Sequence, residues 1–324
     1  MLIYHCRESD EMEIEVTESD SGQRLDIFLA GKVEGLSRRR AQDLIDRGKV
    51  LRNGHSVRKG IKVEVGDEIQ VLERPALAND EAVKNANIGF EVHFEDEHFV
   101  IVEKPAGMPT HPLKSNEDDT LANGLASRYP EMQGVGFSPL QPGLVNRLDI
   151  DTSGLVLASR TEKAWKALRE IMVSSEMTKG YTSLCEGTVA SPRTLDWYLV
   201  NDSRDRRKVH ACETEIEAQR LGARPAQTRV VSALFHLGFS TAHLEVRSAF
   251  RHQIRVHMAM AGHPLLGDTL YGGRSVEGQS GHLLHASSLR FPHPFESKMV
   301  HIESKTPVVF GQVVESLGST TKQH

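Results

Sequence analysis

The stretch that decides the fold of this chain is residues 144–160, LVNRLDIDTSGLVLASR. Its second half is an apolar run typical of a buried strand, and it predicts a strand over residues 155–158. Its first half places two carboxylates, Asp149 and Asp151, in a polar turn directly before that strand. Because a buried strand would hold this turn in place, the turn is the first candidate for a functional site.

Three kinds of chemistry could use such a turn. A calcium loop needs a bidentate carboxylate at its twelfth position, where this chain has Arg160. A magnesium-dependent phosphotransferase places its aspartate directly after a buried strand, but polar Asn146 and Arg147 precede Asp149. The third is a single carboxylate that acts as a covalent catalyst, kept ionised by an arginine. A surface aspartate that caps a turn is the alternative to all three.

Composition limits the class of protein. With 324 residues, the chain is long enough for about two domains of roughly 150 residues each. The three cysteines form no CxxC pair, which argues against a zinc ribbon or a disulfide framework and is typical of a reducing compartment. The N-terminus is acidic, and no apolar run approaches the roughly 18 residues of a membrane span. We therefore expect a cytoplasmic protein that does not enter the membrane.

Basic residues gather in one N-terminal segment, although the formal net charge is −5. Residues 36–62 contain nine Lys or Arg and only two Asp. A helix is predicted over residues 38–47, and Asn53-Gly54 is typical of a hairpin turn between two strands. Arginines in the first turn of a helix oppose its dipole, which favours contact with phosphates; a solvated charged face is the alternative.

This segment resembles the S4-like, or alpha-L, RNA-binding domain first described in a ribosomal protein. The resemblance covers about residues 22–72 and rests on GQRLDIFLA, SRRRAQDLIDRGKVLRNG and VEVGDEIQV. It implies an RNA-binding domain over residues 12–73, and the polar residues 74–89 are predicted to be a linker. The residues that it implies as RNA contacts are Arg38, Arg39, Arg40, Arg47, Lys49 and Arg52.

Five further segments give the acidic turn its context. They are DEHFVIVEKPAGMPTHP (96–112), MTKGYTSLCEG (177–187), RHQIRVHM (251–258), GHPLLGDTLYG (262–272) and HLLHASSLRFPHP (282–294). In this order around NRLDIDTSG, they resemble the RluA-type pseudouridine synthases of bacteria. The resemblance implies a catalytic domain over residues 90–324 of fold class α+β, with a long, mainly antiparallel sheet and a central cleft.

The same resemblance implies an isomerase that converts uridine to pseudouridine in structured RNA and needs no cofactor and no metal. It assigns Asp149 as the catalytic carboxylate, Arg255 as its partner and Tyr181 as the residue that packs against the base. The implied substrate-binding residues are Arg147, Lys179, His252 and Ile254. Whether Asp149 attacks the sugar, attacks the base or removes a sugar proton stays open.

The chain departs from the family pattern at two places. The family usually has His before the RLD sequence, where this chain has Asn146. It usually has Gly-Arg-Thr or Gly-Arg-Lys before HQIR, where this chain has Ala249-Phe250-Arg251. The alternative to an active enzyme is therefore a weakened or inactive RNA-binding protein that assists ribosome assembly. Large-subunit ribosomal RNA is the favoured substrate, transfer RNA is the alternative, and the family implies a monomer.

Local patterns predict several further elements. Two short strands should flank residues 95–97, and a hairpin should span residues 228–247. Helices are predicted at residues 162–173, 252–261 and 308–317. Residues 263–272 should form a structural loop, and Trp165 and Trp197 should pack in the core. The basic run at residues 204–208, RDRRK, is either an RNA contact or a solvated loop.

Overall fold

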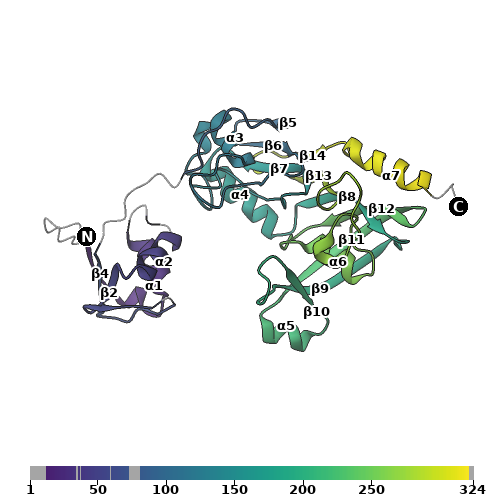
Figure 1. Ribbon diagram of the computed structural model, residues 1–324. Helices are drawn as coiled ribbons and strands as arrows, with labels where there is room; N and C mark the ends of the chain where they lie inside the picture. Colours follow the sequence, from purple (N-terminus) through teal and green to yellow (C-terminus); the bar gives the residue numbers. More distant parts are fainter. Residues whose placement is uncertain (1–11, 34–35, 37, 59, 73–80, 321–324) are drawn as a thin grey trace. The chain divides into compact units, whose positions relative to one another are not determined.

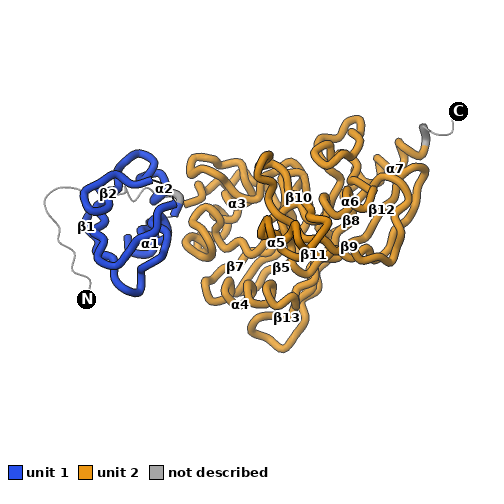
Figure 2. The backbone as a smooth tube through the Cα atoms, turned by 90° about the horizontal axis from the view of Figure 1, so that it is seen from below, with its two compact units in different colours: residues 1–80 blue, residues 81–324 orange. Residues whose placement is uncertain are grey.

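The computed structural model describes residues 12–33, 36, 38–58, 60–72 and 81–320. They belong to two compact units, Met1–Asp80 and Glu81–His324 (Figure 1, Figure 2). Of the predicted linker, residues 74–80 lie outside the described residues. Residues 81–89 belong to the second unit, where Ala82 and Asn85 donate backbone N–H groups to the carbonyls of Pro139 and Asn123.

The first unit combines two helices with a four-stranded antiparallel sheet of order β1-β4-β2-β3. Its elements are β1 (Met12–Glu15), η1 (Glu18–Asp20), α1 (Leu25–Lys32), α2 (Arg38–Asp46), β2 (Val50–Arg52), β3 (His55–Ser56) and β4 (Glu68–Val71). The predicted helix and hairpin are confirmed, and Asn53 and Gly54 both adopt the positive φ that the turn requires. Strand β1 was not predicted, because its alternating MEIE pattern lies in an acidic segment.

A buried carboxylate joins the two helices of the first unit. Asp26 of α1 accepts hydrogen bonds from the side chains of Arg24 (3.0 Å), Arg38 (2.8 Å) and Gln42 (2.5 Å). Burial alone would raise the pKa of Asp26, but these bonds outweigh burial and lower it. Arg38, a predicted RNA contact, is therefore also a tie between α1 and α2.

Two other predicted RNA contacts also have acidic partners. Arg52 pairs with Asp67 at 2.7 Å and with Glu64 at 3.0 Å, across the loop before β4. Arg47 pairs with Asp43 one turn earlier in α2, where both side chains are exposed. The side chain of Arg39 lies outside the described residues. A contact between these residues and RNA stays a prediction.

The second unit is built on a mixed sheet of ten strands. Nine of them follow the order β10-β9-β11-β12-β8-β13-β7-β6-β5, and β14 pairs with β13. The strands are β5 (Glu91–Glu95), β6 (Phe99–Lys104), β7 (Ser153–Ser159), β8 (Thr178–Glu186), β9 (Arg193–Asn201), β10 (Val209–Cys212), β11 (Arg224–His236), β12 (Phe239–Val246), β13 (Leu284–Pro292) and β14 (Met299–Glu303). Among the strand pairs of the described residues, β13–β7 alone is parallel, so the predicted α+β class with a long, mainly antiparallel sheet is confirmed.

Helices accompany this sheet along its length (Figure 1). They are α3 (Leu121–Arg128), η2 (Pro130–Met132), α4 (Glu162–Val173), α5 (Glu215–Leu221), α6 (Gln253–Met260), η3 (Thr269–Tyr271) and α7 (Val308–Thr320). Helix α4 begins where predicted, because the hydroxyl of Thr161 accepts the N–H of Ala164. Within the described ranges, no helix combines the length and the apolar character needed to cross a membrane.

Strand β7 lies inside the sheet, between β13 and β6. Gly154 has a φ of 111°, and a Cβ at this position would lie 2.3 Å from the carbonyl oxygen of Ala286. Only glycine fits this approach, because any side chain would collide with the backbone of β13. This contact sets the position of the polar turn before β7, which carries Asp149 and Asp151.

We expect Asp26→Asn to destabilise the first unit by about 2 kcal/mol at pH 7, because three donors lose a charged acceptor. The pKa of Asp26 is lowered on folding, so this stabilisation is present above the unfolded value of about 3.9 and is lost as the pH falls. The stability of the variant should therefore fall less than that of the wild type as the pH is lowered. Hydrogen exchange of the α2 amides between pH 3 and pH 7 measures both effects.

Asp43→Asn is the matched control for this experiment, because it removes one exposed ion pair of the same helix. Such pairs contribute about 0.5 kcal/mol or less. Equal losses in the two variants would show that Asp26 does not join the helices.

Candidate active site

One guanidinium lies between two carboxylates in the second unit. Arg255 donates from Nη1 to Oδ2 of Asp149 at 2.9 Å. Its Nε and Nη2 donate to the two oxygens of Asp268 at 2.7 and 2.9 Å. The side chain of Asp268 is buried, whereas that of Asp149 is 25% exposed. Arg255 is thus held from behind by one carboxylate and faces a second that opens to solvent.

The three charged residues come from three separate segments. Asp149 lies in the turn before β7, Arg255 lies in α6, and Asp268 directly precedes η3. Burial alone would lower the pKa of Arg255, but the bonds to both carboxylates raise it, so the guanidinium remains charged. Residues 263–272, predicted as a structural loop, also supply the buried carboxylate of the site. Sequence reasoning missed Asp268, which lies in the quoted motif GHPLLGDTLYG without any local pattern that assigns it to the site.

His252 and Tyr271 form the second layer around the ion pair. The Nε2 atom of His252 lies 3.6 Å from Oδ2 of Asp149, and its Nδ1 atom lies 2.8 Å from the hydroxyl of Tyr271. Arg255 lies over the Tyr271 ring, 5.1 Å from its centroid. Burial lowers the pKa of His252 to about 4, so the imidazole is neutral at pH 7. Sequence reasoning did not single out Tyr271.

An apolar wall stands beside Asp149. Tyr181 of β8 and Ile254 of α6 are buried in one hydrophobic cluster, and Leu148 packs against it. Burial, followed by the negative charge of Asp149, raises the pKa of Tyr181, so its hydroxyl is protonated at neutral pH. An aromatic and an aliphatic side chain next to a carboxylate suit a flat, uncharged ring.

A pocket opens on another side of the guanidinium. It has a volume of about 410 Å³, and its lining includes Arg255, Asp268, Asp151 and His282. Burial raises the pKa of Asp151, although Arg255 and Lys104 oppose this rise. The second aspartate of the turn thus faces a polar cavity, and Asp149 is the one that meets Arg255.

A buried lysine holds the backbone of the turn. The Nζ atom of Lys104 donates to the carbonyls of Pro105 (2.8 Å), Met108 (2.7 Å) and Ile150 (2.9 Å). Ile150 lies between the two aspartates, so the bond from Lys104 to its carbonyl holds the backbone of the turn in place. Burial lowers the pKa of Lys104 to about 8, against the opposing charges of both aspartates.

Two histidines of the HLLHA segment hold the hydroxyl groups that follow the turn. His282 Nε2 lies 2.7 Å from Oγ1 of Thr152, and His285 Nδ1 lies 2.9 Å from Oγ of Ser153. Burial lowers the pKa of His282 to about 4 and also lowers that of His285. Both imidazoles are therefore neutral at pH 7, and each carries a single ring proton.

The direction of the hydrogen bonds at His285 follows from its other neighbour. The hydroxyl of Ser304 donates its only proton to the carboxylate of Glu103 and lies 3.1 Å from Nε2 of His285. Ser304 must then accept from Nε2–H, which leaves Nδ1 as an acceptor for Ser153. A directed chain of hydrogen bonds thus runs from the start of β7 to a carboxylate on β6.

The remaining predicted substrate-binding residues lie at different depths. Arg147 is exposed and donates to Nε2 of His111 at 3.3 Å. Lys179 is buried on β8, on the same face as Tyr181. Burial, followed by the charge of Arg169, lowers the pKa of Lys179 to about 8. The structure therefore places Arg147 at the surface and Lys179 in the interior.

Both departures from the family pattern have structural roles. The side-chain oxygen of Asn146 accepts the N–H of Leu157 at 2.7 Å, which ties the polar turn to β7. Phe250 packs against a buried cluster that includes Leu199 and Val256. The intact ion pair between Arg255 and Asp149 shows that neither departure dismantles the site.

Within the described residues, three groups of side chains could hold a metal ion. They are His210, Cys212 and Glu217; Glu91, His93 and Glu103; and Asp96, His293 and Glu296. None of these groups contains Asp149, Arg255 or Asp268. They therefore do not assign a metal ligand at the ion pair.

Comparison with known families identifies both units. A family model described as RNA pseudouridylate synthase matches residues 98–260. A second model, described as S4 domain, matches residues 23–69. The first spans the turn that carries Asp149 and the whole of α6, and the second spans both helices of the first unit. The two resemblances found in the sequence are therefore confirmed.

Curated relatives match nearly the whole chain. An uncharacterised RNA pseudouridine synthase of Chloroflexus aurantiacus is 32% identical over 98% of this chain and 97% of its own length. Ribosomal large subunit pseudouridine synthase D of Zymomonas mobilis is 33% identical over 91% of this chain and 94% of its own. The enzyme of the same name from Xylella fastidiosa is 31% identical over 93% and 91%.

Two solved structures share the fold of the second unit. Human RNA pseudouridylate synthase domain containing 4 matches with a TM-score of 0.54 and 19% identity, over 70% of this chain and 92% of its own. Human RNA pseudouridylate synthase domain containing 1 matches with a TM-score of 0.51 and 23% identity, over 68% and 84%. At this identity the similarity supports the fold alone.

The unequal burial of the two carboxylates predicts unequal effects on stability. Asp268→Asn should lower the free energy of unfolding by about 3 kcal/mol, because it leaves a buried guanidinium without its buried partner. Asp149→Asn should cost about 1 kcal/mol or less, because Asp149 is partly exposed and Arg255 keeps Asp268. Urea unfolding of the full chain measures both, and similar losses would contradict this ranking.

Proposed function

The chain belongs to the RNA pseudouridylate synthase family, and from this premise we propose that it converts specific uridines of large-subunit ribosomal RNA to pseudouridine. That it is an RNA pseudouridine synthase, an isomerase, follows from the family and its relatives. The observation that carries the proposal is the carboxylate of Asp149, which Arg255 holds at 2.9 Å beside an apolar wall. The choice of RNA is supported by the S4 domain and by two relatives named for the large ribosomal subunit.

The chemistry needs little besides an ionised carboxylate and a dry, shaped site. The bond between N1 of the base and C1′ of the ribose breaks, and a bond between C5 and C1′ forms. C5 loses a proton and N1 gains one, so the product is an isomer and no redox step occurs. In duplex RNA the base must first leave the stack, which costs a few kcal/mol. Binding energy from the rest of the RNA has to offset that cost.

Each proposed role at the reacting uridine has a structural basis. Asp149 acts on the nucleotide, and all three roles considered for it need the ionised carboxylate. Arg255 positions that carboxylate and neutralises part of its charge. Tyr181 and Ile254 contact the faces of the uracil ring, which is flat and uncharged. These assignments rest on the geometry of the site together with the family motifs.

The outer residues are proposed to hold the RNA. Arg147 is exposed beside the catalytic turn, where its guanidinium can occupy the space left by the flipped base. His252, beside Asp149, is proposed to donate one hydrogen bond to the bound nucleotide or to accept one from it. Lys179 acts from the interior, by supporting the strand that carries Tyr181. In the first unit, the proposed phosphate contacts are Arg38, Arg39, Arg40, Arg47, Lys49 and Arg52.

The proposal includes a monomer that acts in the cytoplasm, where ribosomal RNA of bacteria is found. Asp149, Arg255 and Asp268 all come from one chain, so a partner subunit is not needed to complete the ion pair. Transfer RNA is the alternative substrate. A weakened or inactive RNA-binding protein is the less favoured alternative, because the ion pair is formed and the relatives are named as synthases.

A pseudouridine map of total cellular RNA, with and without the gene, tests reaction and substrate together. We expect one or more uridines of large-subunit ribosomal RNA to stay unmodified in the deletion strain and to regain modification with the wild type. Asp149→Ala should fail to restore them, because loss of the carboxylate should slow the reaction by about 100-fold or more. Asp118→Ala, which removes an exposed carboxylate outside the site, is the control and should restore them.

The map also separates the alternatives. Changes confined to transfer RNA would replace the proposed substrate. An unchanged map, with the purified protein still bound to RNA, would contradict the enzymatic function.

The lowered pKa of Lys104 predicts an alkaline decline in rate. Above pH 8 the amine loses its charge and keeps only two protons for three carbonyl acceptors, so the turn that carries Asp149 loses one tie. Single-turnover rates should therefore fall between pH 8 and pH 9.5. Lys104→Met should be slow at every pH and lack this decline.

Lys179→Met is the control, because the pKa of Lys179 is also lowered to about 8. It should keep the alkaline decline if Lys104 causes it. A decline that persists in Lys104→Met and disappears in Lys179→Met would contradict the prediction, because it would show that Lys179 causes the decline.

A further inference from the structure

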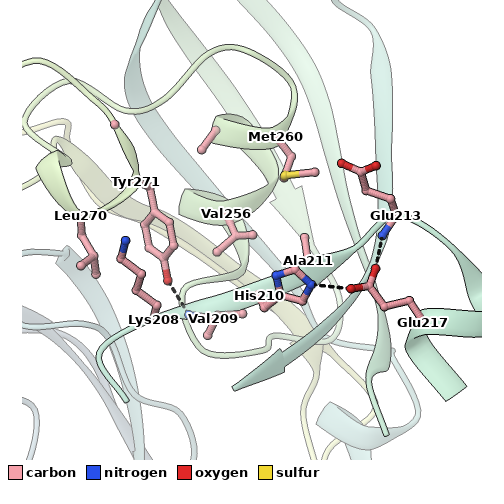
Figure 3. Close-up of a pocket in the computed structure, with 12 residues that line it drawn as sticks. Lys208, Val209, His210, Ala211, Glu213, Glu217, Val256, Met260, Leu270 and Tyr271 are labelled. Atoms are coloured by element: carbon pink, nitrogen blue, oxygen red, sulfur yellow. Dashed lines mark hydrogen bonds and ion pairs between the residues drawn. The ribbon is translucent and has the colours of Figure 1, made fainter. Parts of the chain in front are cut away.

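A second, larger pocket is lined by Tyr271, whose ring also contacts Arg255 of the ion pair. Its volume is about 740 Å³, and strand β10, helix α6 and the η3 segment supply its walls (Figure 3). The side chains that matter to its chemistry are Lys208, His210, Glu217, Met260, Leu270 and Tyr271. A volume of this size is typical of a site for a small molecule or one nucleotide.

The pocket and the active site share a side chain. Tyr271 lines the pocket, while its hydroxyl accepts the N–H of Val209 at 2.8 Å and meets His252 at 2.8 Å. The guanidinium of Arg255 lies over its aromatic ring. Helix α6 links the two places as well, because Val256, which lines the pocket, directly follows Arg255. An RNA strand that places a uridine at Asp149 therefore passes close to this pocket.

The lining suits a nucleobase. Val256, Met260 and Leu270 are apolar and line one pocket together, and the side chain of Met260 is 39% exposed, so an apolar ring can reach it. At one end, Glu217 bonds to His210 at 3.0 Å, and this bond lowers the pKa of the carboxyl group. An ionised carboxylate there can accept a hydrogen bond from the N–H groups of a base.

The opposite end of the pocket is cationic. Lys208 lines it and closes the basic run of residues 204–208, in which Arg204 and Arg206 are exposed. Arg251 anchors this run by donating from Nη2 to the carbonyls of Arg206 (2.9 Å) and Lys208 (2.7 Å). Because Arg251 directly precedes His252, the basic run is tied to the active site. Cations at such a position attract phosphates.

We propose that this pocket binds one nucleotide of the substrate RNA next to the target uridine. Its base packs on Met260 and Leu270, and its phosphate contacts Lys208. The proposal rests on the proposed function, since it takes RNA as the substrate. It gives the basic run at residues 204–208 a role in RNA contact, which the sequence left undecided. It also means that the base next to the target uridine contributes to the choice of substrate.

Two measurements test the proposal, and they do not depend on each other. In the first, 2-aminopurine replaces the nucleotide on the 5′ or the 3′ side of the target uridine in a short RNA. Binding of wild-type protein should change its fluorescence at one of these positions. Met260→Trp, which fills the pocket, and Lys208→Ala should each abolish most of that change. Leu234→Trp, at an exposed position of β11 that does not line the pocket, is the matched control and should keep it.

In the second measurement, the same nucleotide is made abasic and the rate of pseudouridine formation is followed. The abasic RNA should react about tenfold more slowly with wild type, as expected when one base loses its packing. Met260→Trp should slow the intact RNA by a similar factor, and combining it with the abasic RNA should add little. Multiplying losses, or full rates with Met260→Trp, would overturn the proposal.

The two readouts separate this proposal from the proposed function. Turnover with no fluorescence change at either neighbouring nucleotide would support the proposed function and contradict the proposed nucleotide pocket. A fluorescence change that needs Met260 but comes with no turnover on any RNA keeps the pocket and removes the proposed reaction. The thermal unfolding temperatures of Met260→Trp and Lys208→Ala must match that of the wild type. If Met260→Trp does not fold, the result with Lys208→Ala decides the test.

Discussion

The structure of the catalytic unit depends on one guanidinium that is shared by two carboxylates. A buried arginine without a partner would be strongly unfavourable, and Asp268 meets that need from behind. The three groups together carry one net negative charge. Because Asp268 is buried and Asp149 is partly exposed, the excess charge is available where a substrate can reach it. A single ion pair of Arg255 and Asp149 would have left no such excess.

The surroundings of this trio hold one short turn. Lys104 binds the carbonyl between the two aspartates, and His282 and His285 hold the hydroxyls of Thr152 and Ser153 after it. The close approach of β7 to β13 at Gly154, described above, completes the frame. These contacts come from two places in the sheet, the end of β6 and the segment that leads into β13. The position of the carboxylate is therefore a property of the sheet and does not rest on a flexible loop.

Much of this organisation was predictable from local sequence. The helix at residues 162–173 and the hairpin at residues 228–247 were predicted because their apolar residues follow the period of each element. Trp165 and Trp197 pack against buried clusters, as expected. No strand or helix was predicted in the segment from residue 193 to residue 221. It forms β9, β10 and α5, and of these β10 and α5 contribute residues to the lining of the larger pocket.

The sequence by itself determined the family, the two RNA-related units and the pairing of Asp149 with Arg255, because ordered motifs carry that information without coordinates. Only the tertiary structure decided which other groups reach the pair. Asp268 was in a quoted motif, yet nothing local shows that it faces Arg255. Tyr271 likewise contacts both the ion pair and the larger pocket only once α6 packs beside β10. Contacts between distant segments depend on how the strands pair, and the periodicity of one segment does not report the pairing of another.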